Sequence, residues 1–488
     1  MRRFAHRMII VLSAATLLFA SCQPESSKGD DNVYWVFDTT MSYDTDPNAW
    51  YTITTEKYAE TAHAIVLVDT NVTEEMIGVN GVSMSEAQAL ADEFENNIYD
   101  KVTTYFAEPM DVDHNGKMKL LIYNIRDENY YMLSSSYIGG YFFSIDEYSN
   151  KSVQQAYPAM HSNQGEIMYI DCDPQDIETE AKGTIAHEFQ HMVNFANAYA
   201  NKTDLMDTWI DEGLAEAANH LCYGPLTDRI GEYNAYDTVA HPINRHPLFY
   251  WDYDNSLPNY DKSYLFFQFL NAQSAGGDDI YKAIYNNQYV DYRAIETAMG
   301  QDATLGGSSW GTTNQERFNR LVLRWYATNS GVAGTLYSYN GRLSGINQSL
   351  PSGASGLLSG AGAIKQNAGV FSSGSAVAGF IYLGVGAAGT GEDFNVSDNI
   401  PASYRFVAAY RNYYPETATS GTSSMPIVFS EDSLIESAQA IEFAGDRLFT
   451  ISAQPRKIDL LPPHSRRPAL FFAPLADEDS SPEEEPEK

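Results

Sequence analysis

The chain has 488 residues, of which 44% are hydrophobic and 13% aromatic, and its formal net charge is −34. This length corresponds to roughly three domains and allows a large buried core. The acidic excess argues against binding to nucleic acid, or to an anionic membrane through a basic face, because like charges repel. A highly soluble protein that holds divalent cations is compatible with this composition.

The first 22 residues have the pattern of an export signal. A basic start, residues 1–7, precedes an apolar run over residues 8–19, and small residues then lead to Cys22. This order is typical of a secretory signal peptide, and the run is too short to span a membrane comfortably. The small residues before Cys22 resemble a bacterial lipobox, in which Cys22 becomes the lipid-modified N-terminus and residues 23–31 a polar tether. We therefore expect a lipid-anchored protein of the bacterial cell envelope, with soluble secretion as the alternative.

Strand and helix patterns alternate over the next hundred residues. Apolar runs at Val33–Phe37, Ala64–Val68 and Met118–Ile125 predict strands, and residues 85–106 predict a helix. Helical patterns dominate further along the chain, including a helix expected over Tyr260–Gln273. The mixture indicates an α+β fold.

The turn before the third of these strands carries several side-chain oxygens. Asp111, Asp113 and Asn115 occupy alternate positions and Gly116 follows, which is the first half of an EF-hand calcium loop. The twelfth position of that loop would be Ile122 rather than Glu, so a calcium ion would need ligands from elsewhere. Two interpretations stay open, a structural calcium site and an Asn-Gly turn that joins a helix to a strand.

The most informative run is His187-Glu188-Phe-Gln-His191. Apolar residues around it recur at helical spacing, so the two imidazoles lie one turn apart on the same face of a helix. Both can bind one zinc ion, and Glu188 then points to the open position of the metal. A core helix with two buried histidines is the alternative. It leaves the acidic residues of this region unexplained, because carboxylates are rarely buried without partners.

A catalytic zinc ion needs a third protein ligand. Glu212 lies 21 positions after His191 (212 − 191). This separation leaves room for one loop and one returning helix, which would bring the carboxylate back to the metal. The sequence therefore predicts one zinc ion per chain, bound by His187, His191 and Glu212.

The segment from Gly165 to Glu216 resembles known metallopeptidases. Its runs HEFQHMVNF and WIDEGLAE look most similar to the hyicolysin family, and the spacing of Asp211 to Glu216 matches the N-E-x-x-S-D motif of thermolysin-like gluzincins. Asp stands here for the Asn of that motif, and Glu for its last Asp. The resemblance implies that Glu212 is the third ligand and that Glu216 hydrogen-bonds the outer nitrogen of His187, which orients the imidazole.

The same resemblance implies an architecture and an activity. The architecture is that of a gluzincin, with a mixed-sheet N-terminal lobe, a zinc-binding helix and a helical C-terminal lobe. The activity is that of an endopeptidase acting on polypeptides, in which Glu188 takes a proton from the attacking water and delivers it to the leaving amine. An aminopeptidase is the nearest alternative, but the G-x-M-E-N segment that holds a substrate amine in such enzymes does not occur. A surface binding lipoprotein that has lost catalysis is the second alternative.

Two further roles follow from the resemblance. The segment that begins with Leu257 is similar to the Tyr-Glu-Lys-Gly segment of gluzincin aminopeptidases, whose Tyr stabilises the oxyanion. This match assigns the role to Tyr260, with Tyr264 as second candidate and a structural tyrosine as the competing interpretation. Other donors that the sequence does not rank are His220, His241 and His246. Finally, Glu166–Asp171 would be an edge strand that pairs with extended substrate, with an interior strand as the alternative.

Cys172 and Cys222 remain after cleavage of the expected signal peptide, besides Cys22. Two cysteines in an exported protein could form one disulfide, which here would brace the surroundings of the metal-site helices. Free thiols are the open alternative. Neither cysteine has CxxC spacing, so a thiolate zinc site is disfavoured.

Composition divides the chain into parts. Residues 32–225 carry the strand patterns and the zinc motif and predict the catalytic N-terminal lobe, and the helical patterns of residues 226–340 predict the second lobe. Residues 341–475 are rich in Gly, Ser and Ala with short apolar runs, which predicts a small β-rich domain. The acidic tail, residues 476–488, predicts disorder.

Overall fold

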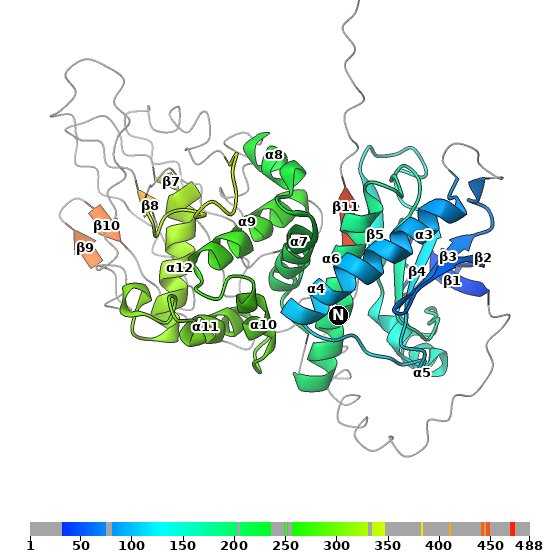
Figure 1. The fold of residues 1–488 in the computed structure, drawn as a ribbon, viewed down its shortest axis with the longest axis horizontal. Coiled ribbons are helices and arrows are strands. Elements are labelled where there is room, and N and C mark those ends of the chain that lie inside the picture. Colours follow the sequence, from blue (N-terminus) through cyan, green and yellow to red (C-terminus); the bar gives the residue numbers. More distant parts are fainter. Residues whose placement is uncertain are drawn as a thin grey trace, which may run out of the picture.

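Figure 1 shows the computed structural model of this chain. It describes residues 32–74, 81–202, 205–235, 248, 251, 256–329 and 334–346, together with five short strands nearer the C-terminus. The expected signal peptide with Cys22, the tether at 23–31 and the tail at 476–488 lie outside the described residues, as does most of the β domain expected at 341–475. In the described part of the chain, no helix is both long and apolar enough to cross a membrane.

A seven-stranded mixed sheet forms one half of the molecule (Figure 1). Its strands are β1 (Val33–Phe37), β2 (Trp50–Glu60), β3 (Ala64–Asp69), β4 (Met118–Tyr123), β5 (Tyr137–Phe142), β6 (Ile167–Asp171) and β11 (Ala469–Ala473). Their spatial order is β1-β2-β3-β4-β6-β5-β11. Strands β3, β4 and β6 run parallel, and the other neighbouring pairs are antiparallel.

Helices cover the sheet and build the other half of the molecule (Figure 1). The α-helices are α3 (Met84–Glu93), α4 (Tyr99–Tyr105), α5 (Asn150–Ala156), α6 (Ala181–Asn201), α7 (Thr208–Tyr223), α8 (Thr227–Ala235), α9 (Leu257–Gln273), α10 (Asp279–Tyr285), α11 (Tyr292–Gln301) and α12 (Asn314–Asn329). Shorter helices are η2 (Pro47–Ala49), η4 (Phe94–Ile98), η5 (Ser144–Glu147) and η6 (Ser308–Trp310). Two small two-stranded sheets join β7 (Tyr382–Leu383) to β8 (Ala409–Tyr410) and β9 (Ile441–Phe443) to β10 (Asp446–Leu448). The described part is thus a mixed α+β structure, as the sequence predicts.

Alternate residues of β4 show how the sheet is buried on both faces. Leu120 and Ile122 belong to the apolar core that includes the helices around the metal site, whereas Leu121 and Tyr123 belong to a second, aromatic-rich core. Because neighbouring side chains of a strand point to opposite faces, the continuous apolar run of β4 is that of a strand covered on both sides.

The three strands and the helix predicted in the first part of the chain are found, and the helix differs from the prediction in one respect. The three predicted strands correspond to β1, β3 and β4. The helix predicted over residues 85–106 is interrupted, because α3 and α4 are separated by the π-helical turn η4. Ser83 caps α3 in a capping box with Glu86, which explains where the helix begins.

The expectation that Glu166–Asp171 forms an edge strand is wrong, and the interior alternative is confirmed. The strand, β6, lies between β4 and β5 and hydrogen-bonds to both. All five of its residues are buried, so its apolar composition reflects burial between two layers. The next strand, β5, pairs with β6 along one edge and along the other with β11, which is the last strand of the sheet.

Two glycines allow the elements of the site to approach closely. A Cβ atom on Gly140 of β5 would lie 2.6 Å from Cγ2 of Thr184 on α6. A Cβ atom on Gly213 of α7 would overlap the ring of Phe267 on α9. The absence of a side chain at these points therefore lets β5 pack against α6 and lets α7 pack against α9.

Candidate metal centre

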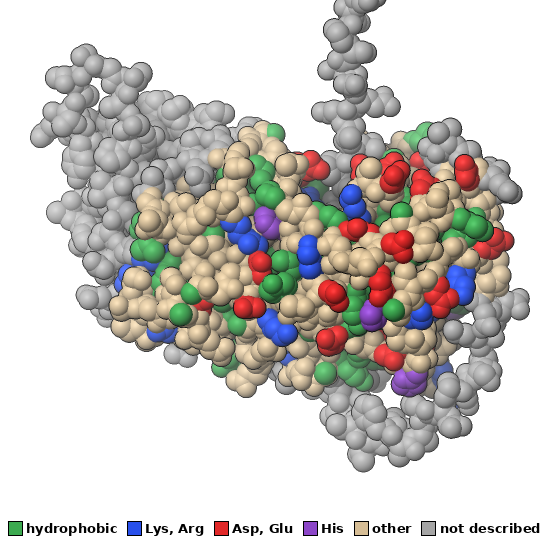
Figure 2. Space-filling model, in the orientation of Figure 1, with side chains coloured by type: hydrophobic (Ala, Val, Ile, Leu, Met, Phe, Trp, Pro, Cys, Tyr) green, Lys and Arg blue, Asp and Glu red, His purple; other side chains and the backbone are tan. Residues whose placement is uncertain are grey.

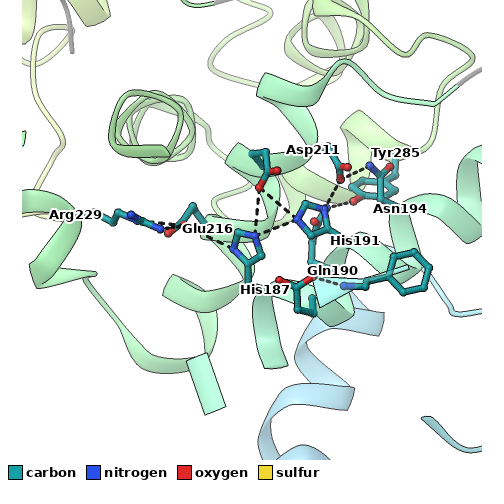
Figure 3. A network of polar contacts seen from close by, with 11 residues as sticks. His187, Gln190, His191, Asn194, Asp211, Glu216, Arg229 and Tyr285 are labelled. Carbon is teal, nitrogen blue, oxygen red and sulfur yellow. Dashed lines mark hydrogen bonds and ion pairs between the residues drawn. The ribbon is translucent and has the colours of Figure 1, made fainter. Parts of the chain in front are cut away.

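Helices α6 and α7 bring the three predicted zinc ligands to one point. His187 and His191 lie one turn apart on α6, and Glu212 lies on α7. The two Nε2 atoms are 3.0 Å apart, and Oε2 of Glu212 lies 3.3 Å from each of them. None of the three residues is more than 3% exposed. Figure 3 shows the two imidazoles turned toward each other.

A zinc ion fits this donor set. Tetrahedral zinc with bonds of about 2.0–2.2 Å separates its ligand atoms by roughly 3.3–3.6 Å, close to the separations found here. Two imidazoles and one carboxylate are also a ligand set of catalytic zinc sites, which keep the fourth position for water. One cation would satisfy three polar atoms that are otherwise crowded together in a buried place.

The surroundings shift the pKa values of the three side chains in different directions. Burial lowers the pKa of His187, which favours the neutral imidazole that a metal requires. Burial also opposes ionisation of Glu212, but the nearby imidazoles, His191 above all, lower the pKa of that carboxyl to about 2. The pKa of His191 is raised despite burial, because Asp211 and Glu212 stabilise its charged form.

The outer nitrogen of His187 faces the carboxylate expected from the motif. Oε1 of Glu216 lies 3.5 Å from Nδ1 of His187, and Arg229 on α8 donates to the same oxygen from Nη2 at 2.9 Å. The geometry brings Glu216 to the place that the resemblance assigned to it. Arg229 was not foreseen, because it lies outside the motif and only the packing of α8 brings it here.

The outer nitrogen of His191 has a carboxylate that the sequence analysis missed. Oδ1 of Asp211 lies 2.9 Å from Nδ1 of His191, and Asn194 donates from its side chain to that same oxygen. Figure 3 shows this cluster behind His191. The acidic residue directly before Glu212 was the available signal, but adjacency alone does not say which way it points.

Glu188, the predicted base, is completely buried beside the ligands. Its Oε2 accepts a hydrogen bond of 2.7 Å from the backbone N–H of Phe142 at the end of β5. Its Oε1 is buried and has no hydrogen-bond partner among the described residues. Burial raises the pKa of this carboxyl to about 8, although the charge of His191 opposes the shift. The backbone of β5 thus fixes Oε2, whereas Oε1 is left to accept a proton.

Of the two tyrosines considered for the oxyanion, Tyr260 lies next to the metal ligands. Its ring centroid is 6.0 Å from that of His187, and the guanidinium of Arg229 lies 4.7 Å from its centroid. Burial, together with the charges of Glu212 and Glu188, raises its pKa. Its role stays a prediction.

Tyr264 is engaged elsewhere. Its hydroxyl lies 2.9 Å from Nδ1 of His220 and accepts the backbone N–H of Leu226 at 3.0 Å. This arrangement also uses His220, whose pKa burial lowers to about 4. His241 and His246, the remaining alternatives, lie outside the described residues.

The predicted disulfide and the predicted calcium site both differ from the expectation. The disulfide between Cys172 and Cys222 is not formed, and both are free thiols. The charged neighbours of Cys172 are Asp171 and Asp173, whereas those of Cys222 come from α3 and α4, so the two sulfurs lie in separate surroundings. In the predicted calcium loop, Asp111 and Asp113 converge with Glu166, and Asn115 donates from its side chain to Oδ2 of Asp113 at 2.9 Å.

Comparison with known proteins supports this chemistry. Residues 118–246, which include all three ligands, match the family DUF2268, described as a predicted Zn-dependent protease. The neutral metalloprotease ShpI of Staphylococcus hyicus is 37% identical over 231 residues, which are 45% of this chain and 50% of that protein. The match therefore spans about half the length of this curated relative. Family and relative both point to a zinc-dependent protease.

Proposed function

We propose that this protein is an exported zinc metalloendopeptidase, with residues 32–225 and 226–340 as the two lobes of its catalytic domain. The observation that carries the proposal is the buried triangle of His187, His191 and Glu212, with the free oxygen of Glu188 beside it. A structural zinc site would be closed by four protein ligands. Three ligands with an adjacent buried carboxylate suit catalysis better.

The chemistry divides among the residues of the site. Zinc bound there would supply a Lewis acid and an acidified water. Oε1 of Glu188 would accept a proton from the attacking water and would pass it to the leaving amine. The Phe142 N–H holds the other oxygen of Glu188 in place. Tyr260 would donate a hydrogen bond from its hydroxyl to the oxyanion that develops on the scissile carbonyl.

The carboxylates behind the histidines orient the site. Glu216 and Asp211 each face an outer imidazole nitrogen. Such partners select the tautomer whose Nε2 lone pair points at the metal, and their loss typically costs about 10–100-fold in metal affinity. Arg229 in turn balances the buried charge of Glu216.

The strand that would receive an extended substrate is β5 rather than β6. The backbone N–H of its last residue, Phe142, donates a hydrogen bond to Glu188. Among the described strands, only β11 lies between β5 and this end of the sheet. A peptide paired with β5 would run beside Glu188 and gain backbone hydrogen bonds with little selectivity for sequence. Because β11 pairs with this same edge, substrate and β11 would compete for it.

The proposal is tested by measuring bound zinc and casein hydrolysis on the purified protein, with and without a chelator. We expect one zinc ion per chain and cleavage that the chelator abolishes. Glu188→Gln should keep the zinc ion and lose hydrolysis, because the amide cannot accept the proton. Glu178→Gln, which changes an exposed carboxylate, is the matched control and should behave like the unmodified protein.

The outcomes separate the alternatives. Zinc without hydrolysis of any peptide would favour the binding lipoprotein. Cleavage that requires a free N-terminal amine, measured with N-acetylated peptides, would favour an aminopeptidase. Full activity of Glu188→Gln would overturn the mechanism.

A further inference from the structure

A second cluster of carboxylates lies away from the zinc ligands, where β4 and β6 begin. Asp111 and Asp113 come from the loop before β4, and Glu166 directly precedes β6. One oxygen of each lies within 4.8 Å of the others. Since β4 and β6 are parallel neighbours, their starts lie at the same edge of the sheet. The cluster therefore joins two segments that are far apart in sequence.

The cluster contains a buried oxygen with no partner. Glu166 is 0% exposed. Its Oε1 accepts the backbone N–H of Val112 at 2.5 Å, but its Oε2 has no hydrogen-bond partner among the described residues. A buried charged oxygen without a partner destabilises the folded protein by roughly several kcal/mol. The buried carboxylate of Glu166 thus lies beside two aspartates and has one oxygen without a partner. A cation bound between the three carboxylates would satisfy that oxygen.

Charge balance points the same way. Within the described residues, the ammonium that reaches the cluster is that of Lys119, which pairs with Asp113. One positive charge cannot balance three carboxylates. A divalent cation would remove the imbalance.

We propose that Asp111, Asp113 and Glu166 bind a calcium ion that fastens the loop before β4 to the start of β6. All three donors are carboxylate oxygens, the ligands that calcium prefers, and backbone carbonyls or water can complete its flexible coordination of six to eight oxygens. Oδ1 of Asn115 already accepts the backbone N–H of Lys117 at 2.6 Å, so the proposed ligand set consists of the three carboxylates. Glu166 supplies the carboxylate that the EF-hand-like loop lacks at its twelfth position.

The test is calcium titration of the zinc-loaded protein, followed by calorimetry and by thermal unfolding. We expect one calcium ion per chain and a midpoint of unfolding that rises with calcium concentration, because the ion binds the folded state only. Glu166→Gln should weaken calcium binding by at least about tenfold and abolish the rise. Asp111→Asn, at an exposed position outside the strands, should do the same if Glu166→Gln fails to fold.

The exposed Glu178→Gln serves as control and should bind calcium like the unmodified protein. Absence of calcium binding, or unchanged binding in folded Asp111→Asn, would overturn the proposal. Equal stabilisation by magnesium would overturn the assignment to calcium. Since neither readout uses proteolysis, the result is independent of the proposed enzymatic function.

Discussion

The outer ring nitrogen of each histidine at the proposed metal site faces a different carboxylate. Glu216 faces His187 and Asp211 faces His191, so a single helix, α7, supplies one proposed ligand and two orienting groups. Positions 212 and 216 are one helical turn apart and share a face, whereas residue 211 points in another direction. That direction suits His191 only because α7 lies alongside α6.

The two tyrosines of α9 provide a test of the oxyanion role. Tyr260→Phe should lower kcat by about 10²-fold with little change in KM, because the lost hydrogen bond is made mainly in the transition state. Steady-state kinetics on a casein-derived peptide measure this split. Equal losses in kcat for Tyr260→Phe and Tyr264→Phe would contradict the assignment.

Tyr264→Phe is the matched control on the same helix. It removes a hydroxyl that His220 and the Leu226 N–H share. Because buried polar groups are left unpaired, we expect a loss of about 1–3 kcal/mol in the free energy of unfolding. Denaturant titration measures this loss, and kcat should stay close to that of the unmodified protein.

At the scale of elements, the contact between α7 and α9 sets the position of Glu212. A methyl group at Gly213 would overlap the ring of Phe267, so Gly213→Ala should destabilise the protein by about 1–3 kcal/mol and weaken zinc binding. Gly231→Ala on α8 is the control, since nothing lies within 4 Å of its added Cβ. There we expect a gain of about 0.5–1 kcal/mol from helix propensity. Similar effects of the two substitutions on zinc affinity would show that the α7–α9 contact is unimportant.

The strand β11 supplies a second test at this scale. Its residues pair antiparallel with β5, from Ala469 opposite Phe142 to Ala473 opposite Tyr137. If substrate uses the same edge, a chain ending at Pro468 should have a lower KM for extended peptides and an unchanged dependence on zinc. A truncated protein that folds, as judged by circular dichroism, and shows a higher KM would instead indicate that β11 helps to bind substrate.

For the whole molecule, the zinc site joins α6, which packs on the sheet, to α7 in the helical half. Zinc binding should therefore stabilise the entire fold. At free zinc of 100 times Kd the gain is about 2.7 kcal/mol, which corresponds to roughly 3–4 °C in Tm, because the entropy of unfolding grows with chain length. Chelation should lower Tm by that amount, and Glu212→Ala should show no response to chelator. Calorimetry measures both.

The distribution of charge is also a property of the whole molecule. On the face shown in Figure 2, acidic side chains gather mainly over the half that contains α3 and α4. Glu212 at the proposed zinc site and Glu166 at the proposed calcium site are instead buried carboxylates. Acidic side chains on the surface favour solubility, and they are distinct from the buried carboxylates of the proposed sites.

The sequence alone indicated two of the proposed metal ligands and the proposed base, because His187, Glu188 and His191 are related by helical geometry over one turn. It also determined the strand pattern of Val33–Phe37 and Met118–Ile125, since side-chain alternation and continuous burial are local signals. The position of Glu212 could be predicted because only one loop separates its helix from the first.

Tertiary structure decided whatever depends on which elements become neighbours. Whether an apolar strand such as Ile167–Asp171 is interior or at an edge depends on its partners, and Asp111 finds Glu166 only because β4 and β6 are adjacent. Cys172 and Cys222 remain apart for the same reason. Asp211, Arg229 and Phe142 gained their contacts to the site through packing between elements, which periodicity along the chain does not encode.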